Sequence, residues 1–239
     1  MVITDQLKAI KVSCRALVLS DWDADGVVSA ALITYSQEYL GVYPLKRKCV
    51  VHLIPVGSRG PDSSIIEEVS GQRFECLVML DQAFNDRVER FLTSVREAVH
   101  YIVYIDHHLS SMIYASKVEK LVDEALIGRS PTAVLLFDLL RALNIRVTDR
   151  LESFVGAITV LERSNRKWHQ KPSKKLVDLA ASISRTLSRN RDRNLWEKII
   201  RWMASPSPLI ASPFTQSLAE MVEERDPKEE SYLKPLAIE

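Results

Sequence analysis

Glycine, cysteine and long apolar runs are all scarce in this chain of 239 residues. It has seven glycines, and Gly156 is the last of them, which excludes a glycine-rich loop from the remainder of the chain. No run of about 18 apolar residues occurs, so we expect no membrane-spanning helix. Residues 1–6 do not resemble a secretory signal, and we therefore expect a cytoplasmic protein.

The three cysteines, Cys14, Cys49 and Cys76, are odd in number and far apart in the sequence. Two of them lie in or beside apolar runs, where a cysteine packs as a small hydrophobic side chain. Disulfides are rare in cytosolic proteins. We therefore expect reduced core cysteines in a cytosolic protein.

Charge is balanced over the whole chain but is unevenly distributed along it. The formal net charge is +1. Residues 163–203 carry 12 basic and 3 acidic residues, whereas the segments on either side are both net acidic. This distribution predicts a local anionic partner rather than a surface that binds polyanions everywhere.

Apolar runs rich in Val and Ile alternate with helical patterns over residues 12–110. The pattern predicts strands at 15–20, 49–56, 76–80 and 100–105, and helices at about 27–40, 63–70 and 85–97. Further along we expect a short strand at 120–123 and helices at about 132–143, 149–163, 174–188 and 192–203. Ser130 is the predicted cap of the first of these helices. The alternation favours a three-layer α/β fold with a parallel sheet and a helical C-terminal part.

Acidic residues and histidines follow three of the predicted strands. These residues are Asp23 and Asp25 after the first strand, Asp81 after the third, and Asp106, His107 and His108 after the fourth. The carboxyl ends of parallel strands meet at one edge of a sheet, where ligands bind. Carboxylates suit magnesium or manganese, and a neighbouring imidazole favours manganese. The sequence therefore predicts a dinuclear site of the kind that holds the attacking and leaving oxygens of a phosphoryl displacement.

Each of these residues also has a structural explanation when it is taken alone. A single Asp after a strand, Asp81 included, is most often a helix cap or a turn residue. A pair of histidines on a loop is more often solvated than bound to a metal. The convergence of three strand ends favours the metal site over these alternatives.

The three segments resemble the signature of the DHH phosphoesterase superfamily. The first, Asp21-Trp22-Asp23-Ala24-Asp25-Gly26, is most similar to the RecJ exonuclease branch, and the resemblance covers about residues 12–165. It implies a three-layer DHH-type domain that binds two manganese or magnesium ions when it is active. It implies that the metal ligands are Asp23, Asp25, Asp81 and His107. It further implies that His108 contacts the substrate phosphate and that Asp106 orients the histidine pair.

The chain departs from the family pattern in two places. The fourth motif of the family normally supplies another Asp, but the corresponding stretch, Gly156–Arg163, contains none. Glu162 is the candidate substitute ligand, although it comes one or two positions late, which turns a helical side chain by about 100–200°. Nothing after Glu162 resembles the glycine-rich second domain that the family's nucleases usually carry.

Two functions follow from the resemblance. The first is a manganese-dependent phosphodiesterase of DNA replication or repair, a nuclease that acts on single-stranded DNA or RNA. The second is a nuclease-inactive replication factor of the CDC-forty-five type, which binds the GINS complex and the replicative helicase. A pyrophosphatase relative is less favoured, because Leu19 occupies the place of the first-motif His in that class.

The basic segment has two interpretations. Its side chains could line a groove for a single strand, with Trp168 and Trp196 stacking on bases. The predicted nucleic-acid-binding residues are Arg166, Lys167, Lys171, Lys174, Lys175 and Arg189. The alternative is a solvated helix face with the tryptophans in the core. We expect three regions: a DHH-type α/β domain at 1–165, a basic helical extension packed on it at 166–204, and a Pro-rich, acidic tail at 205–239.

Overall fold

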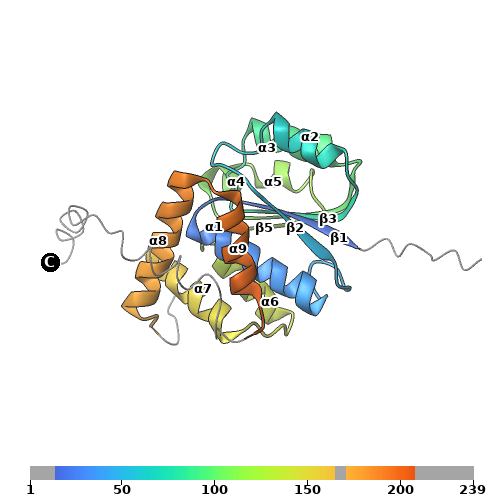
Figure 1. Cartoon of the computed structure of the whole chain (residues 1–239). Helices are drawn as coiled ribbons and strands as arrows, with labels where there is room; N and C mark the ends of the chain where they lie inside the picture. Colours follow the sequence, from blue (N-terminus) through green and yellow to red (C-terminus); the bar gives the residue numbers. More distant parts are fainter. Residues whose placement is uncertain (1–13, 165–170, 208–239) are drawn as a thin grey trace, which may run out of the picture.

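A five-stranded sheet forms the centre of the molecule (Figure 1). The structure is a computed structural model that describes residues 14–164 and 171–207. All neighbouring strands are parallel, in the order β2–β1–β3–β4–β5. The strands are β1 (Arg15–Ser20), β2 (Val50–Pro55), β3 (Phe74–Leu80), β4 (Val99–Asp106) and β5 (Glu124–Ile127). The predicted parallel α/β fold is confirmed.

Helices cover both faces of this sheet (Figure 1). One face carries α2 (Ser63–Ser70), α3 (Asp86–Val95) and the short helices α4 (Leu109–Ile113) and α5 (Ala115–Val118). The other face carries α1 (Ala24–Thr34), α6 (Thr132–Ala142), α7 (Asp149–Leu161), α8 (Lys174–Asn190) and α9 (Arg193–Ala204). A π-helical segment, η1 (Tyr35–Leu40), continues α1 and ends at Gly41, as the sequence predicts. The sheet is thus the middle of three layers.

Side chains of the central strands pack into two separate hydrophobic clusters, one on each face. In β1, Ala16 and Val18 belong to the cluster under α1, whereas Leu17 and Leu19 belong to the cluster under α2 and α3. All four side chains are fully buried. A strand that is buried on both faces must be apolar at every position, which explains the continuous runs in the sequence.

The prediction of a short strand at 120–123 is wrong, because β5 begins only at Glu124. The side chain of Asp123 is instead a hydrogen-bond partner of neighbouring elements. It accepts the N–H of Ile102 at 2.7 Å and pairs with Arg96 of the α3 end at 2.6 Å. Asp123 therefore ties the start of β5 to β4 without itself belonging to a strand.

The prediction of reduced cysteines is wrong for two of the three. Cys14 and Cys49 form a disulfide. The register between β1 and β2 pairs Arg15 with Val50, so the cysteines that precede them lie side by side at the start of both strands. Cys76 is free and buried, and burial raises the pKa of its thiol.

The α8–α9 pair packs against α1 and along the edge strand β2. Trp196 of α9 is fully buried, and its indole N–H donates to the Asp21 carbonyl at 3.2 Å. Arg193 and Arg201 donate to the carbonyls of Leu53 and Val51, at 3.3 and 3.1 Å. These bonds hold α9 along β2 and against the turn that follows β1. No helix in the described ranges is long and apolar enough to cross a membrane.

Candidate metal centre at the carboxyl edge of the sheet

The turn after β1 positions the first two carboxylates. Asp23 caps α1, and its side chain accepts the N–H of Gly26 at 2.9 Å. A Cβ on Gly26 would lie 2.7 Å from the Asp21 carbonyl oxygen, so only glycine fits here. Ser20 closes the turn by donating its hydroxyl to the Gly26 carbonyl at 2.7 Å. The cap makes α1 begin at Ala24, earlier than the predicted start at Val27.

Asp25 lies in the first turn of α1, yet it is buried and reaches across to the start of α6. Its two oxygens accept the backbone N–H groups of Thr132 and Ala133, each at 2.8 Å. The predicted cap, Ser130, makes no such bond, since the residue before α6 is Pro131 and the helix has no side-chain cap of its own. Asp25 therefore accepts hydrogen bonds from two N–H groups at the start of α6 that have no partner within the helix, and these bonds fix its carboxylate.

Asp81 follows β3 with a left-handed backbone, at φ +54°. A non-glycine residue rarely adopts this conformation outside functional sites and turns. The strain directs the buried Asp81 carboxylate toward the β1 turn, where the Thr132 hydroxyl donates to it at 3.1 Å. The Nε2 atom of His107 lies 3.3 Å from Asp81 and 3.7 Å from Asp25. Three strand ends therefore deliver two carboxylates and an imidazole to one point.

Asp106, the last residue of β4, is fully buried and orients His108. One carboxylate oxygen lies 2.8 Å from Nδ1 of His108, and the other accepts the His108 backbone N–H at 3.1 Å. Ser111 also donates to Asp106, and it lies 2.8 Å from the Tyr104 hydroxyl. With Nδ1 engaged by Asp106, Nε2 is the ring nitrogen of His108 that remains available to an ion or a substrate. The bond to Asp106 raises the pKa of His108, which favours the imidazolium.

The carboxylates of this cluster disfavour one another's ionisation. Burial, followed by the nearby Asp23 carboxylate, raises the pKa of Asp21 to about 6. Burial and neighbouring carboxylates hold the pKa values of Asp25 and Asp81 well above their usual range. Burying several carboxylates together is unfavourable unless a cation compensates them. A bound divalent ion would supply that compensation and restore the ionised forms.

The donor atoms fit such an ion. Ligand atoms of Asp81, His107 and His108 all lie within 4.8 Å of one another, and the Asp25 carboxylate lies beside them. Carboxylate oxygens with one or two imidazoles are a donor set that suits manganese and tolerates magnesium. The geometry brings Asp25, Asp81 and His107 together. The Asp23 side chain is seen only as the cap of α1, and metal binding by these four residues stays a prediction.

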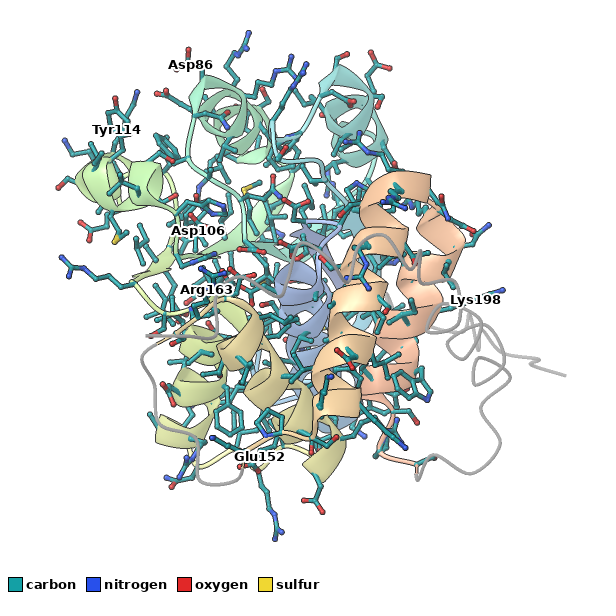
Figure 2. The ribbon with its side chains drawn as sticks, turned by 90° about the vertical axis from the view of Figure 1, so that its left-hand side faces the viewer. Asp86, Asp106, Tyr114, Glu152, Arg163 and Lys198 are labelled. Carbon is teal, nitrogen blue, oxygen red and sulfur yellow. A yellow bond between two sulfur atoms is a disulfide. The ribbon has the colours of Figure 1, made fainter. Side chains whose placement is uncertain are left out.

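Glu162 comes to the same site from the helical side. A cavity of about 310 Å³ is lined by His107, Arg129, Ser130, Pro131, Glu162, Arg163 and Ser164. Burial and then the Asp23 carboxylate raise the pKa of Glu162, while His107 and His108 lower it. Helix α7 has ended at Leu161, so the rotation expected for a late helical position does not apply to Glu162. In Figure 2, Arg163 marks this end of α7 and Glu152 marks the opposite end.

None of the four predicted nucleic-acid-binding residues that the structure describes lines this cavity. Arg166 and Lys167 lie outside the described residues, as does Trp168. The remaining four are exposed, with Lys171, Lys174 and Lys175 at or before the start of α8 and Arg189 at its far end. Base stacking by Trp196 is excluded, because its ring is fully buried with its centroid 6.2 Å from that of Trp22. Trp22 is likewise a packing residue.

Sequence reasoning missed three residues that shape the site: Thr132, Ser111 and Arg129. Thr132 uses both its N–H and its hydroxyl on Asp25 and Asp81. The sequence predicted a helix start near Ser130, but nothing local indicated that the first amides of this helix bind Asp25. Position along the sequence therefore indicated the strand-end ligands, whereas tertiary contacts alone reveal what supports them.

Comparisons with known proteins bear on the fold. No protein-family model matches the sequence, and no curated protein matches it. An exonuclease RecJ bound to manganese is similar at TM-score 0.53 and 17% identity, over 93% of this chain and 64% of that chain. RecJ from Thermus thermophilus in complex with Mn²⁺ is similar at TM-score 0.55 and 17% identity, over 93% of this chain and 37% of that one.

The DHH domain of a protein from a family of ribosomal proteins is similar at TM-score 0.59 and 16% identity, over 92% of this chain and 56% of that one. The chain thus spans less than two thirds of the length of each of these three proteins. Likeness at such identities establishes a shared fold.

Proposed function

We propose that this chain, whose fold is that of the DHH-type, RecJ-like proteins, is a metal-dependent phosphodiesterase that acts on single-stranded nucleic acid in DNA replication or repair. The observation that carries the proposal is the convergence of Asp25, Asp81 and His107, with His107 Nε2 at 3.3 and 3.7 Å from the two carboxylates. A strained Asp81 backbone at the same point supports it. Two of the similar structures contain manganese, which supports the choice of metal.

Asp23, Asp25, Asp81 and His107 would hold manganese or magnesium, in two positions if the site is fully loaded. When bound, such ions supply Lewis acidity and activate water for attack on phosphorus. Asp25 stays fixed during the reaction because two backbone N–H groups of α6 hold its carboxylate. Glu162 is the residue of this chain that could complete the set in place of the missing fourth-motif Asp, and it lines the cavity beside His107.

His108 is the residue that would meet the substrate phosphate. Asp106 fixes its tautomer and raises its pKa, so Nε2 can donate a charged hydrogen bond to a phosphate oxygen. Charge grows on those oxygens in the transition state, and a donor that is already oriented stabilises it without reorganisation. Asp106 acts only through His108 and is a positioning residue.

The second candidate is a nuclease-inactive replication factor of the CDC-forty-five type that binds GINS and the replicative helicase. The observation in its favour is the absence of Asp from the stretch that matches the fourth motif. A protein of this kind would keep the fold and the strand-end residues without turnover. A cytoplasmic location belongs to both candidates.

One pair of assays separates the two candidates. Labelled single-stranded DNA and RNA are incubated with the protein and Mn²⁺ or Mg²⁺, with EDTA as one control and the Asp81→Ala variant as the other. Metal-dependent cleavage above both controls supports the nuclease. Cleavage no greater than that of Asp81→Ala rejects it, and capture of GINS subunits at micromolar concentration would then support the replication factor.

A further inference from the structure

A second cavity, of about 400 Å³, opens at the carboxyl edge of the sheet beside the metal centre. Three arginines from three separate elements line it: Arg59 from the loop after β2, Arg87 from the first turn of α3, and Arg191 from the α8–α9 connection. Gly57, Ser58 and Asp62 complete most of its wall. None of these residues belongs to the metal centre, and only Arg191 lies in the segment that the sequence singles out as basic.

The loop after β2 is held between the metal centre and α3. The N–H of Val56 donates to the Ser20 carbonyl at 2.8 Å, which ties the start of the loop to the end of β1. Gly60 has φ +87°, and a Cβ there would lie 3.1 Å from Val88 of α3. At Gly57 a Cβ would meet nothing nearer than the Arg191 guanidinium, at 3.8 Å. The Arg191 guanidinium therefore lies over the backbone of this loop at Gly57.

Arg191 is fixed in place by the residues around it. It ends α8 in the left-handed conformation, at φ 48°, and its N–H donates to the Leu187 carbonyl. Immediately after it, Asp192 caps α9, and Arg193 pairs with Glu68 of α2 at 2.9 Å. Trp196 bonds the Asp21 carbonyl. These contacts on both sides of Arg191 hold the α8–α9 connection in place, with Arg191 at the cavity.

Three arginines and one carboxylate line the cavity, which gives it an excess of positive charge. Among the described residues, none of the three guanidiniums makes a salt bridge within 4.0 Å. The one carboxylate that lines the cavity, Asp62, accepts from Ile65 and Ser64 as the cap of α2 and also interacts electrostatically with Arg87. Unpaired guanidiniums in a concave site are the usual means of binding a phosphate.

We propose that this cavity binds a phosphate group of the nucleic acid strand, next to the phosphodiester held at the metal centre, and that the α8–α9 pair exists in part to supply Arg191 to it. This inference rests on the proposed function. Asp21 links the two sites, because its carbonyl accepts the indole N–H of Trp196 in α9 and its carboxylate interacts electrostatically with both Arg191 and His108. A strand that lies along this edge would thus pass from the carboxylate cluster to the three arginines.

The test uses Arg191→Gly in the full chain. Glycine adopts the left-handed conformation freely, so this variant removes the guanidinium while keeping the helix end intact. Arg87→Gln is a second variant, and Arg146→Gln, which changes an exposed arginine between α6 and α7, matches their loss of charge. Affinity for a labelled oligothymidylate is measured in EDTA, so no strand is cleaved, over a series of salt concentrations.

We expect Arg191→Gly and Arg87→Gln each to weaken binding about tenfold or more, as for the loss of a charge-assisted hydrogen bond. The slope of log K against log salt should become shallower by about 0.7 for each lost phosphate contact. Arg146→Gln should bind as the wild type does. Wild-type affinity and slope in Arg191→Gly, or equal losses in Arg146→Gln, would overturn the inference.

Cleavage assays on the same variants distinguish this outcome from failure of the proposed function. If the wild type cleaves and Arg191→Gly still binds normally, the nuclease stands and the phosphate site is rejected. If the wild type does not cleave but Arg191→Gly loses binding, the phosphate site stands and the nuclease is rejected.

Discussion

The candidate site has two halves that the chain builds in different ways. One half consists of residues that follow strands, namely the Asp21–Gly26 turn, Asp81 and Asp106–His108. The other half comes from helix ends, with Glu162 after α7 and Arg191 after α8. Sheet register fixes the first half, whereas the docking of helices fixes the second. The residues of the strand half can therefore be inferred from the sequence, whereas those of the helix half become visible only in the structure.

The largest effect is expected in the strand half, from Asp81→Asn. Asparagine keeps an oxygen for the Thr132 hydroxyl but loses the charge that would hold a cation. Mutation of a residue that only orients a metal ligand lowers metal affinity or activity by about 10–100-fold. Loss of a ligand itself should therefore lower cleavage by more than about 100-fold. Calorimetric titration with Mn²⁺ should show the same loss of affinity.

The metal-free fold should tolerate this substitution, because burial already favours the neutral form of Asp81. Asp86→Asn, on the exposed start of α3, is the matched control. Wild-type Mn²⁺ affinity in Asp81→Asn would remove Asp81 from the site.

The next effect concerns the orientation of His108 by Asp106. In Asp106→Asn the charged bond to Nδ1 is lost, and we expect turnover to fall by about 10–100-fold. Because that bond raises the pKa of His108, its loss should also move the acidic form of His108 to lower pH. As the pH rises, cleavage by the variant should therefore decline at a lower pH than cleavage by the wild type. Ser111→Ala removes the bond to Asp106 and the contacts with the Phe84 N–H and the Tyr104 hydroxyl, but it keeps the Asp106–His108 pair, so it should cost less turnover. An unchanged profile would mean that His108 does not act as the acid.

A smaller effect is expected in the helix half, from Glu162→Gln. If Glu162 completes the metal site, Mn²⁺ affinity should fall by about tenfold, at the lower end of the range for supporting groups. Glu152→Gln is a close control, since it changes the same residue type at the other end of α7 (Figure 2). Equal affinities in the two variants would show that Glu162 contributes nothing, and the strand half would then be the whole metal site.

The smallest effect tests the docking of the α8–α9 pair on β2. Burial and then Arg15 lower the pKa of His52, which is a hydrogen-bond partner of Arg15 at 3.0 Å and also faces Arg201. A histidine with a lowered pKa in the folded state must lose stabilisation as the pH falls through its unfolded value, near 6.5. We expect the Tm to fall modestly between pH 7 and pH 5. His52→Gln should flatten this part of the curve, and an identical curve in the variant would assign the effect elsewhere.

Much of the fold could be predicted because its signals are local. Helix α2 begins and ends where the sequence indicates, and so does β1, since turn residues and caps border both. The Cys14–Cys49 disulfide could not be predicted, because it depends on which strand lies beside β1 and in what register. The prediction of Ser130 as the cap of α6 fails for the same reason, since Asp25 binds the first N–H groups of that helix from more than a hundred residues away.

The candidate site divides along the same line. The meeting of Asp25, Asp81 and His107 can be predicted because each follows or closely follows a parallel strand. The approach of Glu162 depends on where α7 ends, and that of Arg191 depends on the Trp196 and Arg193 contacts of α9. Neither of these approaches leaves a local pattern in the sequence.

The most direct test of the account is a crystal structure of the protein grown with Mn²⁺, with anomalous scattering measured at the manganese edge. We expect at least one anomalous peak between the Asp25 and Asp81 carboxylates and the His107 imidazole. Well-ordered side chains at this point with no manganese peak among them, or a peak bound only elsewhere, would contradict it.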